Sequence, residues 1–193
     1  MQKKTLVVAT GNAHKLLEIA QIFPDFEVVS QKQAGFCEEV EETGATFVEN
    51  ALIKARAACA ALGLPVLADD SGLCVSALGG APGVYSARYC GHHGDDKGNR
   101  RLLLKNMQEK SDRTAYFCCA VAVVYPDGIE WTAEGKTYGR ILTEESGDGG
   151  FGYDPIFFSD DLQKSFGTAT AEEKNTVSHR YRALSALREK VQL

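Results

Sequence analysis

The sequence predicts an α/β protein with a mixed β-sheet. Short apolar runs typical of buried strands alternate with amphipathic segments typical of helices along the 193 residues. Residues 114–125 and 129–142 flank a Pro-Asp-Gly turn and therefore indicate a long β-hairpin. Because a hairpin joins antiparallel strands, we expect the sheet to be mixed and not purely parallel.

The first third of the chain is predicted to contain a buried strand, an amphipathic helix and a second strand, at residues 5–9, 13–23 and 26–31. A longer helix is expected after Thr46, because Thr46 and Glu49 have the spacing of a capping box. Gly63 and Pro65 should end this helix, since glycine favours the left-handed C-cap and proline cannot continue a helix.

The remaining elements follow from the same patterns. Two short strands are expected at residues 65–69 and 73–78, on either side of an Asp-Asp-Ser-Gly turn. Residues 99–108 are predicted to be helical. After the hairpin, a glycine-rich loop at residues 144–154 leads into a strand, and residues 178–191 form a terminal amphipathic helix.

The composition is that of an ordinary globular protein, with 44% hydrophobic and 24% charged residues and a net charge of -5. This mild acidity argues against nucleic-acid and membrane partners, because phosphate-rich surfaces bind clustered cations. No apolar run approaches the length of a membrane span or a signal peptide. The six cysteines lack C-x-x-C spacing, so we expect reduced thiols in a cytoplasmic protein, with a disulfide framework as the alternative.

The first candidate site is the segment 7–15, in which a buried strand runs into a tight turn and a helix. Helix-start amides, the Thr10 hydroxyl, the Asn12 amide and Lys15 would together form a cradle for an anion. The Walker A spacing is absent. A capped turn with a solvated lysine is the alternative.

The second candidate is the sequence Ala-Asp-Asp-Ser-Gly at residues 68–72. A carboxylate at a strand end commonly holds a divalent cation or takes a proton from water. Adjacent residues of an extended chain point to opposite faces, so Asp69 and Asp70 are expected to have different roles, one structural and one reactive. Ser71 would donate to a phosphate oxygen, and a plain turn is the alternative.

The acidic run at residues 38–42 precedes a predicted helix, where carboxylates suit the helix dipole, so a solvated face is the default interpretation. If the run folds beside Asp70, Glu41 or Glu42 becomes a magnesium ligand. Lys54, two turns into the following helix, would then reach a phosphate.

Two further segments suit ligand recognition, the first of a nucleobase and the second of a carbonyl-rich group. At residues 149–155, glycines allow the backbone to approach a ligand, Phe151 offers a ring face and Asp154 offers an acceptor. Residues 172–180 place several donors at a helix start, namely Lys174, Ser178, His179 and Arg180. A packed turn and ordinary surface residues are the alternatives.

The loop at residues 90–96 has the composition of a metal site, since it contains Cys90, His92, His93, Asp95 and Asp96. Its spacing matches no tetrahedral zinc pattern, so an exposed loop without metal is the prediction.

The chain resembles the non-canonical purine nucleoside triphosphate pyrophosphatases, also called inosine triphosphate pyrophosphatases. The resemblance covers nearly the whole chain and rests on six segments in family order, which are TGNAHK, ETGATFVENALIKA, ADDSGL, ALGGAPGVYSARY, GGFGYDPIF and SHR. It implies a single domain over residues 1–193, with an elongated fold of two lobes around a long mixed sheet, flanking helices, a nucleotide cleft between the lobes and a homodimeric assembly. The implied reaction is Mg²⁺-assisted hydrolysis of ITP, dITP or XTP to the monophosphate and pyrophosphate.

The same resemblance implies roles for individual residues. Asp70 would be the general base and a metal-associated residue, Ser71 would contact the substrate, and Glu41 or Glu42 would help to hold Mg²⁺. The phosphates would be bound by Thr10, Gly11, Asn12, Ala13, His14 and Lys15. The base would be bound by Phe151, Gly152, Tyr153, Asp154, Lys174, His179 and Arg180.

Three alternative functions can be weighed against this one. A pyrophosphatase for pyrimidine or modified nucleotides is disfavoured by the SHR and FGYDP segments. A nucleotide-binding regulatory module would have lost the base or the metal carboxylates, which are present here. A nucleic-acid-binding protein would need a basic stripe, which a chain of net charge -5 lacks overall.

Overall fold

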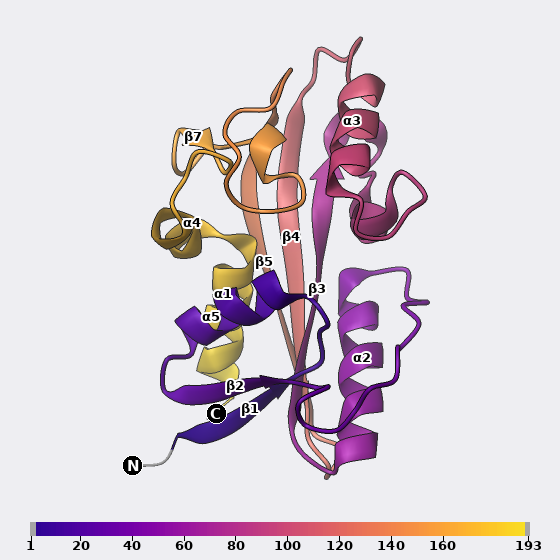
Figure 1. Cartoon of the computed structure of the whole chain (residues 1–193), viewed down its shortest axis with the longest axis vertical. Helices are drawn as coiled ribbons and strands as arrows, with labels where there is room; N and C mark the ends of the chain where they lie inside the picture. Colours follow the sequence, from indigo (N-terminus) through magenta and orange to yellow (C-terminus); the bar gives the residue numbers. More distant parts are fainter. Residues whose placement is uncertain (1–2, 192–193) are drawn as a thin grey trace. The chain divides into compact units, whose positions relative to one another are not determined.

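Figure 1 shows the computed structural model of the chain, in which residues 3–191 are described. The strands are β1 (Lys4–Val8), β2 (Phe26–Ser30), β3 (Val66–Val75), β4 (Thr114–Val124), β5 (Glu130–Ile141), β6 (Phe157–Ser159) and β7 (Lys164–Ser165). The helices are α1 (Ala13–Ile22), α2 (Phe47–Leu62), α3 (Asp96–Asn106), α4 (Ala171–Val177) and α5 (His179–Lys190), and short 3₁₀ helices occupy Ser76–Leu78, Gly83–Arg88 and Asp154–Ile156.

The strands form one seven-stranded sheet in the order β2-β1-β3-β4-β5-β6-β7. Strand β1 pairs in parallel with β2 and β3, whereas β6 pairs antiparallel with β5 and β7. The predicted hairpin is formed by β4 and β5, and Tyr125 N donates to Ile129 O at 2.9 Å in the turn that joins them. The mixed α/β class is therefore confirmed.

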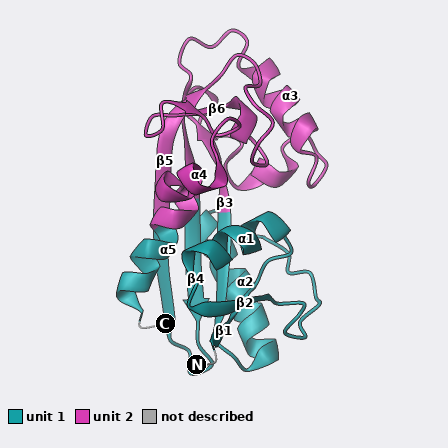
Figure 2. Cartoon of the chain, turned by 60° about the vertical axis from the view of Figure 1, so that its left-hand side comes forward, with its two compact units in different colours: residues 1–70, 119–134, 183–193 teal, residues 71–118, 135–182 magenta. Residues whose placement is uncertain are grey.

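The chain divides into two compact units, which Figure 2 colours separately. Unit 1 comprises residues 1–70, 119–134 and 183–193, and unit 2 comprises residues 71–118 and 135–182. Strands β3, β4 and β5 contribute residues to both units.

Unit 1 has a core on each face of its part of the sheet. Leu6 and Val8 pack with side chains of α1 and α5, whereas Val7 and Ala9 pack with side chains of α2. Successive residues of a strand therefore enter opposite layers, which is the alternation expected of extended backbone. The same alternation continues in β3, where Leu67 and Ala68 belong to opposite layers.

Helix α2 has the predicted capping box and C-terminal stop. Glu49 N donates to Thr46 Oγ1 and Thr46 N donates to Glu49 Oε2, both at 3.2 Å. Gly63 follows the helix with a φ of 64°, the left-handed conformation that glycine adopts without strain. The inner face carries small side chains, including the fully buried Ala51 and Ala55, so this helix can lie close to the sheet.

The core of unit 2 is rich in aromatic side chains. Phe117 of β4 lies 4.7 Å from Phe157 and 6.1 Å from Phe166, measured between ring centroids. Leu103 and Met107, from α3 and its C-cap, belong to the same cluster. This cluster surrounds several of the predicted base-binding residues.

Two predictions about the elements are wrong. Residues 66–75 form one continuous strand, where two short strands and a turn were expected. All of them except Ser71 are buried, and a break would leave buried backbone groups without the partners that a strand provides. Helix α4 lies where no helix was expected, although Thr170 and Glu173 form a second capping box at its start.

The state of the cysteines and the apolarity of the helices were also predicted from the sequence. All six cysteines are free thiols, as predicted. Within residues 3–191, no helix is long and apolar enough to cross a bilayer.

Candidate active site

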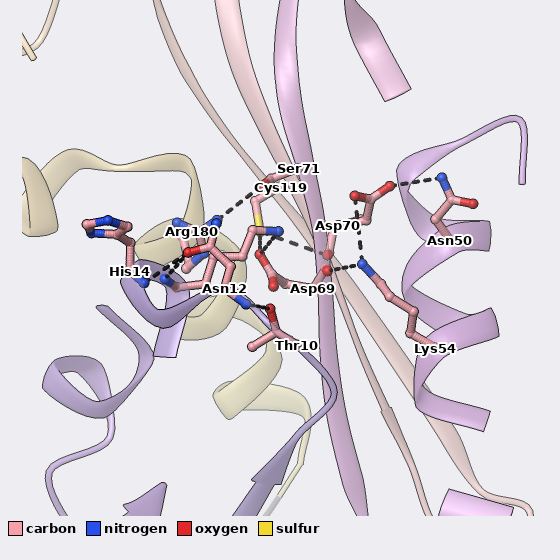
Figure 3. Close-up of polar contacts among 12 residues, drawn as sticks. Thr10, Asn12, His14, Asn50, Lys54, Asp69, Asp70, Ser71, Cys119 and Arg180 are labelled. Atoms are coloured by element: carbon pink, nitrogen blue, oxygen red, sulfur yellow. Dashed lines mark hydrogen bonds and ion pairs between the residues drawn. The ribbon is translucent and has the colours of Figure 1, made fainter. Parts of the chain in front are cut away.

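The side chains of Asp69 and Asp70 lie on opposite faces of β3 (Figure 3). The Oδ2 atom of Asp69 forms an ion pair with Lys15 Nζ at 3.1 Å, on the side of the sheet covered by α1. Asp70 faces α2, where Asn50 Nδ2 donates to its Oδ2 at 3.0 Å. Both carboxylates are buried, and each has a lysine on its own side of the strand. The expectation that the two residues face opposite layers is confirmed.

The Asp70 carboxylate is anchored by one oxygen and faces a lysine with the other. Its Oδ1 lies 3.9 Å from Lys54 Nζ. Asn50, which holds Oδ2, is fully buried, and its own Oδ1 accepts from Gly44 N at 2.8 Å, so the amide is oriented. Burial raises the pKa of Asp70 above that of an ordinary aspartate, and the charges of Lys54 and Lys15 offset only part of this effect. A carboxylate with a raised pKa is a stronger base.

Lys54 joins the acidic loop before α2 to β3. Its Nζ donates to Glu42 Oε1 at 2.5 Å and to the carbonyl oxygen of Asp69 at 2.8 Å. Burial lowers the pKa of Lys54, but attraction to Asp70, Asp69 and Glu42 outweighs burial, and the net shift of its pKa is upward. Of the two glutamates proposed as metal ligands, the structure brings Glu42 to this cluster, whereas Glu41 is exposed.

The turn at residues 10–15 is capped by its own side chains. Asn12 N donates to Thr10 Oγ1 at 3.1 Å, and Asn12 Oδ1 accepts from His14 N at 2.9 Å and from Lys15 N at 3.2 Å. Gly11, Asn12, Ala13 and His14 are exposed. An anion that bound these helix-start amides would take the place of Asn12 Oδ1 as their acceptor.

Three of the predicted base-binding residues meet in unit 2. Lys174 Nζ lies 2.8 Å from Asp154 Oδ2, and these side chains are only 6% and 3% exposed. The same oxygen accepts from Phe151 N at 2.8 Å, and Lys174 Nζ lies 4.5 Å from the centroid of the Phe151 ring. Gly150 has a φ of 72°, and a Cβ there would lie 2.1 Å from Asp154 Oδ2, so only glycine fits without displacing the carboxylate.

His179 and Arg180 are buried at the start of α5. The His179 ring stacks on Phe117, with centroids 4.8 Å apart and planes inclined by 13°. Arg180 Nη2 donates to Ser71 Oγ at 3.0 Å. Tyr153 points into the core of unit 2, where its hydroxyl donates to Ser86 O at 2.9 Å.

The loop at residues 90–96 has structural contacts. Asp95 caps α3 by accepting from Gly98 N at 2.9 Å, and Asp96 Oδ2 accepts from Gly152 N at 2.8 Å. His92 and His93 are exposed. In the described part of the chain, residues 3–191, no group of three or more His, Cys, Asp or Glu side chains is arranged to hold a metal ion.

Three residues of these clusters were not selected as site residues by the sequence analysis. Asn50 left a usable signal, because it is the polar amide on a helix face whose other buried residues are apolar. Phe117 left none, since it is one apolar residue in a long apolar strand. Asp96 was noticed only as part of a possible metal site, and its contact with Gly152 spans 56 residues of sequence.

Comparison with known proteins supplies independent findings. Residues 6–190 match the Ham1 family. A Haemophilus influenzae protein named dITP/XTP pyrophosphatase is 47% identical over 195 residues, covering 98% of this chain and 100% of the relative, and a Streptomyces coelicolor protein of the same name is 46% identical over 188 residues, covering 94% of each. The solved structure of the Staphylococcus aureus Ham1 protein is similar with a TM-score of 0.89 and 40% identity, covering 98% of each chain. A nucleoside-triphosphatase / dITP/XTP pyrophosphatase from Mycobacterium abscessus gives a TM-score of 0.78 at 46% identity, covering 95% of this chain and 98% of the other.

Proposed function

Because the chain belongs to the Ham1 family, we propose that it hydrolyses non-canonical purine nucleoside triphosphates, such as dITP, ITP and XTP, to the monophosphate and pyrophosphate. It is a nucleoside triphosphate pyrophosphohydrolase, and it would remove these compounds from the nucleotide pool. The observation that carries the proposal is the buried Asp70, held by Asn50 and facing Lys54 on β3.

Asp70 is the proposed general base. Asn50 Nδ2 donates to Oδ2 and thereby orients the carboxylate towards Lys54. The attacking water forms a bond from its oxygen to the α-phosphorus and gives its proton to Asp70, while the bond to the bridging oxygen breaks and pyrophosphate leaves. The raised pKa of Asp70 supports this role, because burial makes its carboxylate more basic than an exposed aspartate.

The donors near Asp70 fit Mg²⁺. Glu42 Oε1 lies 2.5 Å and Asp70 Oδ1 lies 3.9 Å from Lys54 Nζ, so the oxygens of two carboxylates face the same ammonium group. Mg²⁺ is usually held by one or two carboxylates together with waters and phosphate oxygens, so this pair suffices. Glu42 is proposed as the ligand because Glu41 is exposed. When bound, Mg²⁺ neutralises charge on the triphosphate.

Lys15, Lys54 and the exposed start of α1 would bind the triphosphate. In the structure Lys15 pairs with Asp69, and Lys54 pairs with Glu42 and Asp70. Phosphate oxygens are anionic acceptors like these carboxylate oxygens, so each ammonium group would exchange its carboxylate partner for a phosphate.

The residues grouped in unit 2 would recognise the base. Hypoxanthine and xanthine carry a 6-oxo acceptor where adenine carries an amino donor, and Lys174, His179 and Arg180 supply donors. A site of donors would leave the adenine amino group without an acceptor, which is how polar sites reject analogues strongly. Phe151, which is partly exposed, would offer its ring face to the purine.

The experiment that tests the proposal is pyrophosphate release from ITP, XTP, GTP and ATP, with and without Mg²⁺, by the wild type, Asp70→Asn and Asp69→Asn. We expect magnesium-dependent release from ITP and XTP, with kcat lowered by roughly 10²–10⁴-fold in Asp70→Asn. Asp69→Asn is the matched neighbour and should act mainly on KM through Lys15.

Each contrary outcome removes a different part of the proposal. Near-normal turnover by folded Asp70→Asn would refute the general base, and equal rates with all four nucleotides would refute the account of base recognition. Release from none of them would refute the hydrolase and favour a nucleotide-binding module.

The homodimer, the nucleotide cleft and the cytoplasmic location stay predictions. Light scattering coupled to size-exclusion chromatography would test the homodimer directly.

A further inference from the structure

The backbone of Gly152, the residue after Phe151, is held by α3 on both sides of its Cα. Gly152 N donates to Asp96 Oδ2 at 2.8 Å, and Gly152 O accepts from Arg100 Nη1 at 2.8 Å. Asp96 and Arg100 are four residues apart in α3, so their side chains lie on one face of the helix and can hold the N–H and the C=O of the same residue.

Arg100 also fixes the beginning of this glycine-rich segment. Its Nε and Nη2 donate to the two carboxylate oxygens of Glu145, at 2.8 Å and 3.4 Å. The arginine is 8% exposed, whereas the Glu145 side chain is 47% exposed, so this ion pair is buried on the arginine side and open to water on the glutamate side. The segment from Glu145 to Gly152 is therefore attached to α3 at both of its ends.

The segment needs such outside contacts because it has little order of its own. Strand β5 ends at Ile141, and the next helix begins at Asp154, so the residues between them form neither helix nor strand. Gly150 and Gly152 both have positive φ values, of 72° and 60°. Glycines lose more backbone freedom on ordering than other residues, so contacts with neighbouring elements decide where this backbone lies.

We propose that Asp96 is a positioning residue for recognition of the purine base. With Arg100 it holds Gly152, and with it the adjacent Phe151 ring, in place before a ligand arrives. The inference rests on the proposed function, because it assumes that Phe151 meets the base. It assigns a role to the second aspartate of the 90–96 loop, and the first, Asp95, has a separate role as the cap of α3.

The expected effect of Asp96→Ala follows from preorganisation. Without its acceptor the Gly152 N–H is released, while Arg100 still holds Gly152 O and Asp154 still holds Phe151 N. The ligand must then supply the part of the ordering that Asp96 provided. The dissociation constant for IMP and the KM for ITP should rise about tenfold, as expected for losing one charge-assisted hydrogen bond. The kcat for ITP should stay near the wild-type value, because uniform binding energy alone is lost.

Three measurements decide the matter. Calorimetry gives the dissociation constant for IMP, steady-state kinetics separate KM from kcat, and amide hydrogen exchange followed by NMR reports the protection of Gly152 N–H. Asp96→Asn is the rescue, since its amide oxygen can still accept from Gly152 N. Asp95→Ala is the matched control, because it removes the neighbouring aspartate and should lower Tm through the lost cap without changing KM.

The outcomes are distinguishable from those that test the proposed function. Faster Gly152 exchange and weaker IMP binding in Asp96→Ala, with rescue by Asp96→Asn, would support the inference even if ITP were not hydrolysed. Wild-type affinity for IMP in Asp96→Ala would overturn it, as would an equal loss of affinity in Asp95→Ala. If the wild type bound no IMP, both the inference and the account of base recognition would fail.

Discussion

Replacing Lys174 by methionine should destabilise the protein severely, because it leaves a buried charge without its cation. The Lys174 and Asp154 side chains are 6% and 3% exposed, and their charged atoms are 2.8 Å apart. Methionine keeps the length and apolar character of the lysine stem, so the change removes the ammonium group with little loss of packing. Asp154 would keep its hydrogen bond from Phe151 N but would have to bury its charge or take up a proton.

The magnitude follows from the burial of the pair. Removing one partner of a buried ion pair typically costs about 3–5 kcal/mol. For a chain of this size each kcal/mol lowers Tm by roughly 2–4 °C, so the expected decrease is about 6–20 °C. The double variant Lys174→Met/Asp154→Asn should recover part of the loss, since neither charge is then unpaired.

The same unit offers a matched control. Lys164 and Glu173 are 2.7 Å apart, nearly the same separation, but their side chains are 37% and 40% exposed. Lys164→Met should therefore cost less than about 1 kcal/mol. The assay is urea unfolding followed by circular dichroism, with calorimetry for Tm. Equal stability of Lys174→Met and Lys164→Met would refute the large cost expected for breaking the buried ion pair.

Four further outcomes are expected. Burial raises the pKa of Asp70 on folding, so the ionised carboxylate opposes folding and Asp70→Asn should be more stable than the wild type at pH 7. In urea unfolding across a pH series, this gain in stability should shrink as the pH falls and should be absent below the unfolded pKa of 3.8. Gly152→Ala should lower the free energy of unfolding by the roughly 1–2 kcal/mol of left-handed backbone strain alone, because the space around its Cβ is open. Gly150→Ala should lower it by more, because its Cβ would also clash with the Asp154 carboxylate, and thermal unfolding of the two variants compares them. Thr46→Ala should lower the free energy of unfolding by about 0.5–2 kcal/mol through the lost cap of α2, and an unchanged urea midpoint would contradict this. A hydrogen bond with the Cys74 thiol is the main cause that raises the pKa of Tyr116 to about 12, so Tyr116→Phe should remove the phenol that titrates near that pH in an ultraviolet absorbance titration.

Local patterns predicted the elements whose determinants lie close together in sequence. The Thr46–Glu49 box and Gly63 are such determinants, and α2 has the bounds that they indicate. The Asp-Asp-Ser-Gly sequence misled for the opposite reason. Adjacent carboxylates usually indicate a turn, but here each meets a lysine distant in sequence, Lys15 for Asp69 and Lys54 for Asp70, so the strand continues through them.

The candidate site was predictable to a similar extent. The motifs selected Asp70, Lys54 and Lys174, and the structure places Lys54 beside Asp70 and Lys174 beside Asp154. Their roles in binding and catalysis stay predictions. The groups that orient these side chains were harder to find, since Asn50 lies inside a helix and Phe117 inside an apolar strand. Their contacts join positions 20 and 62 residues apart, which no local pattern records. The start of α4 was predictable, because its capping box has the same spacing as that of α2.

The two carboxylates of β3 also constrain how this gene can change in length. Ala68 packs on the side of α2 and Leu67 on the side of α1, so the strand is fixed in phase with both layers. Deleting or inserting one residue between Val66 and Asp69 would turn Asp69 towards Lys54 and Asp70 towards Lys15. Both aspartates would remain, yet Asn50 would face the wrong one. We therefore expect functional descendants of this sequence to keep the residue count of β3 unchanged and to accumulate insertions in the exposed loops.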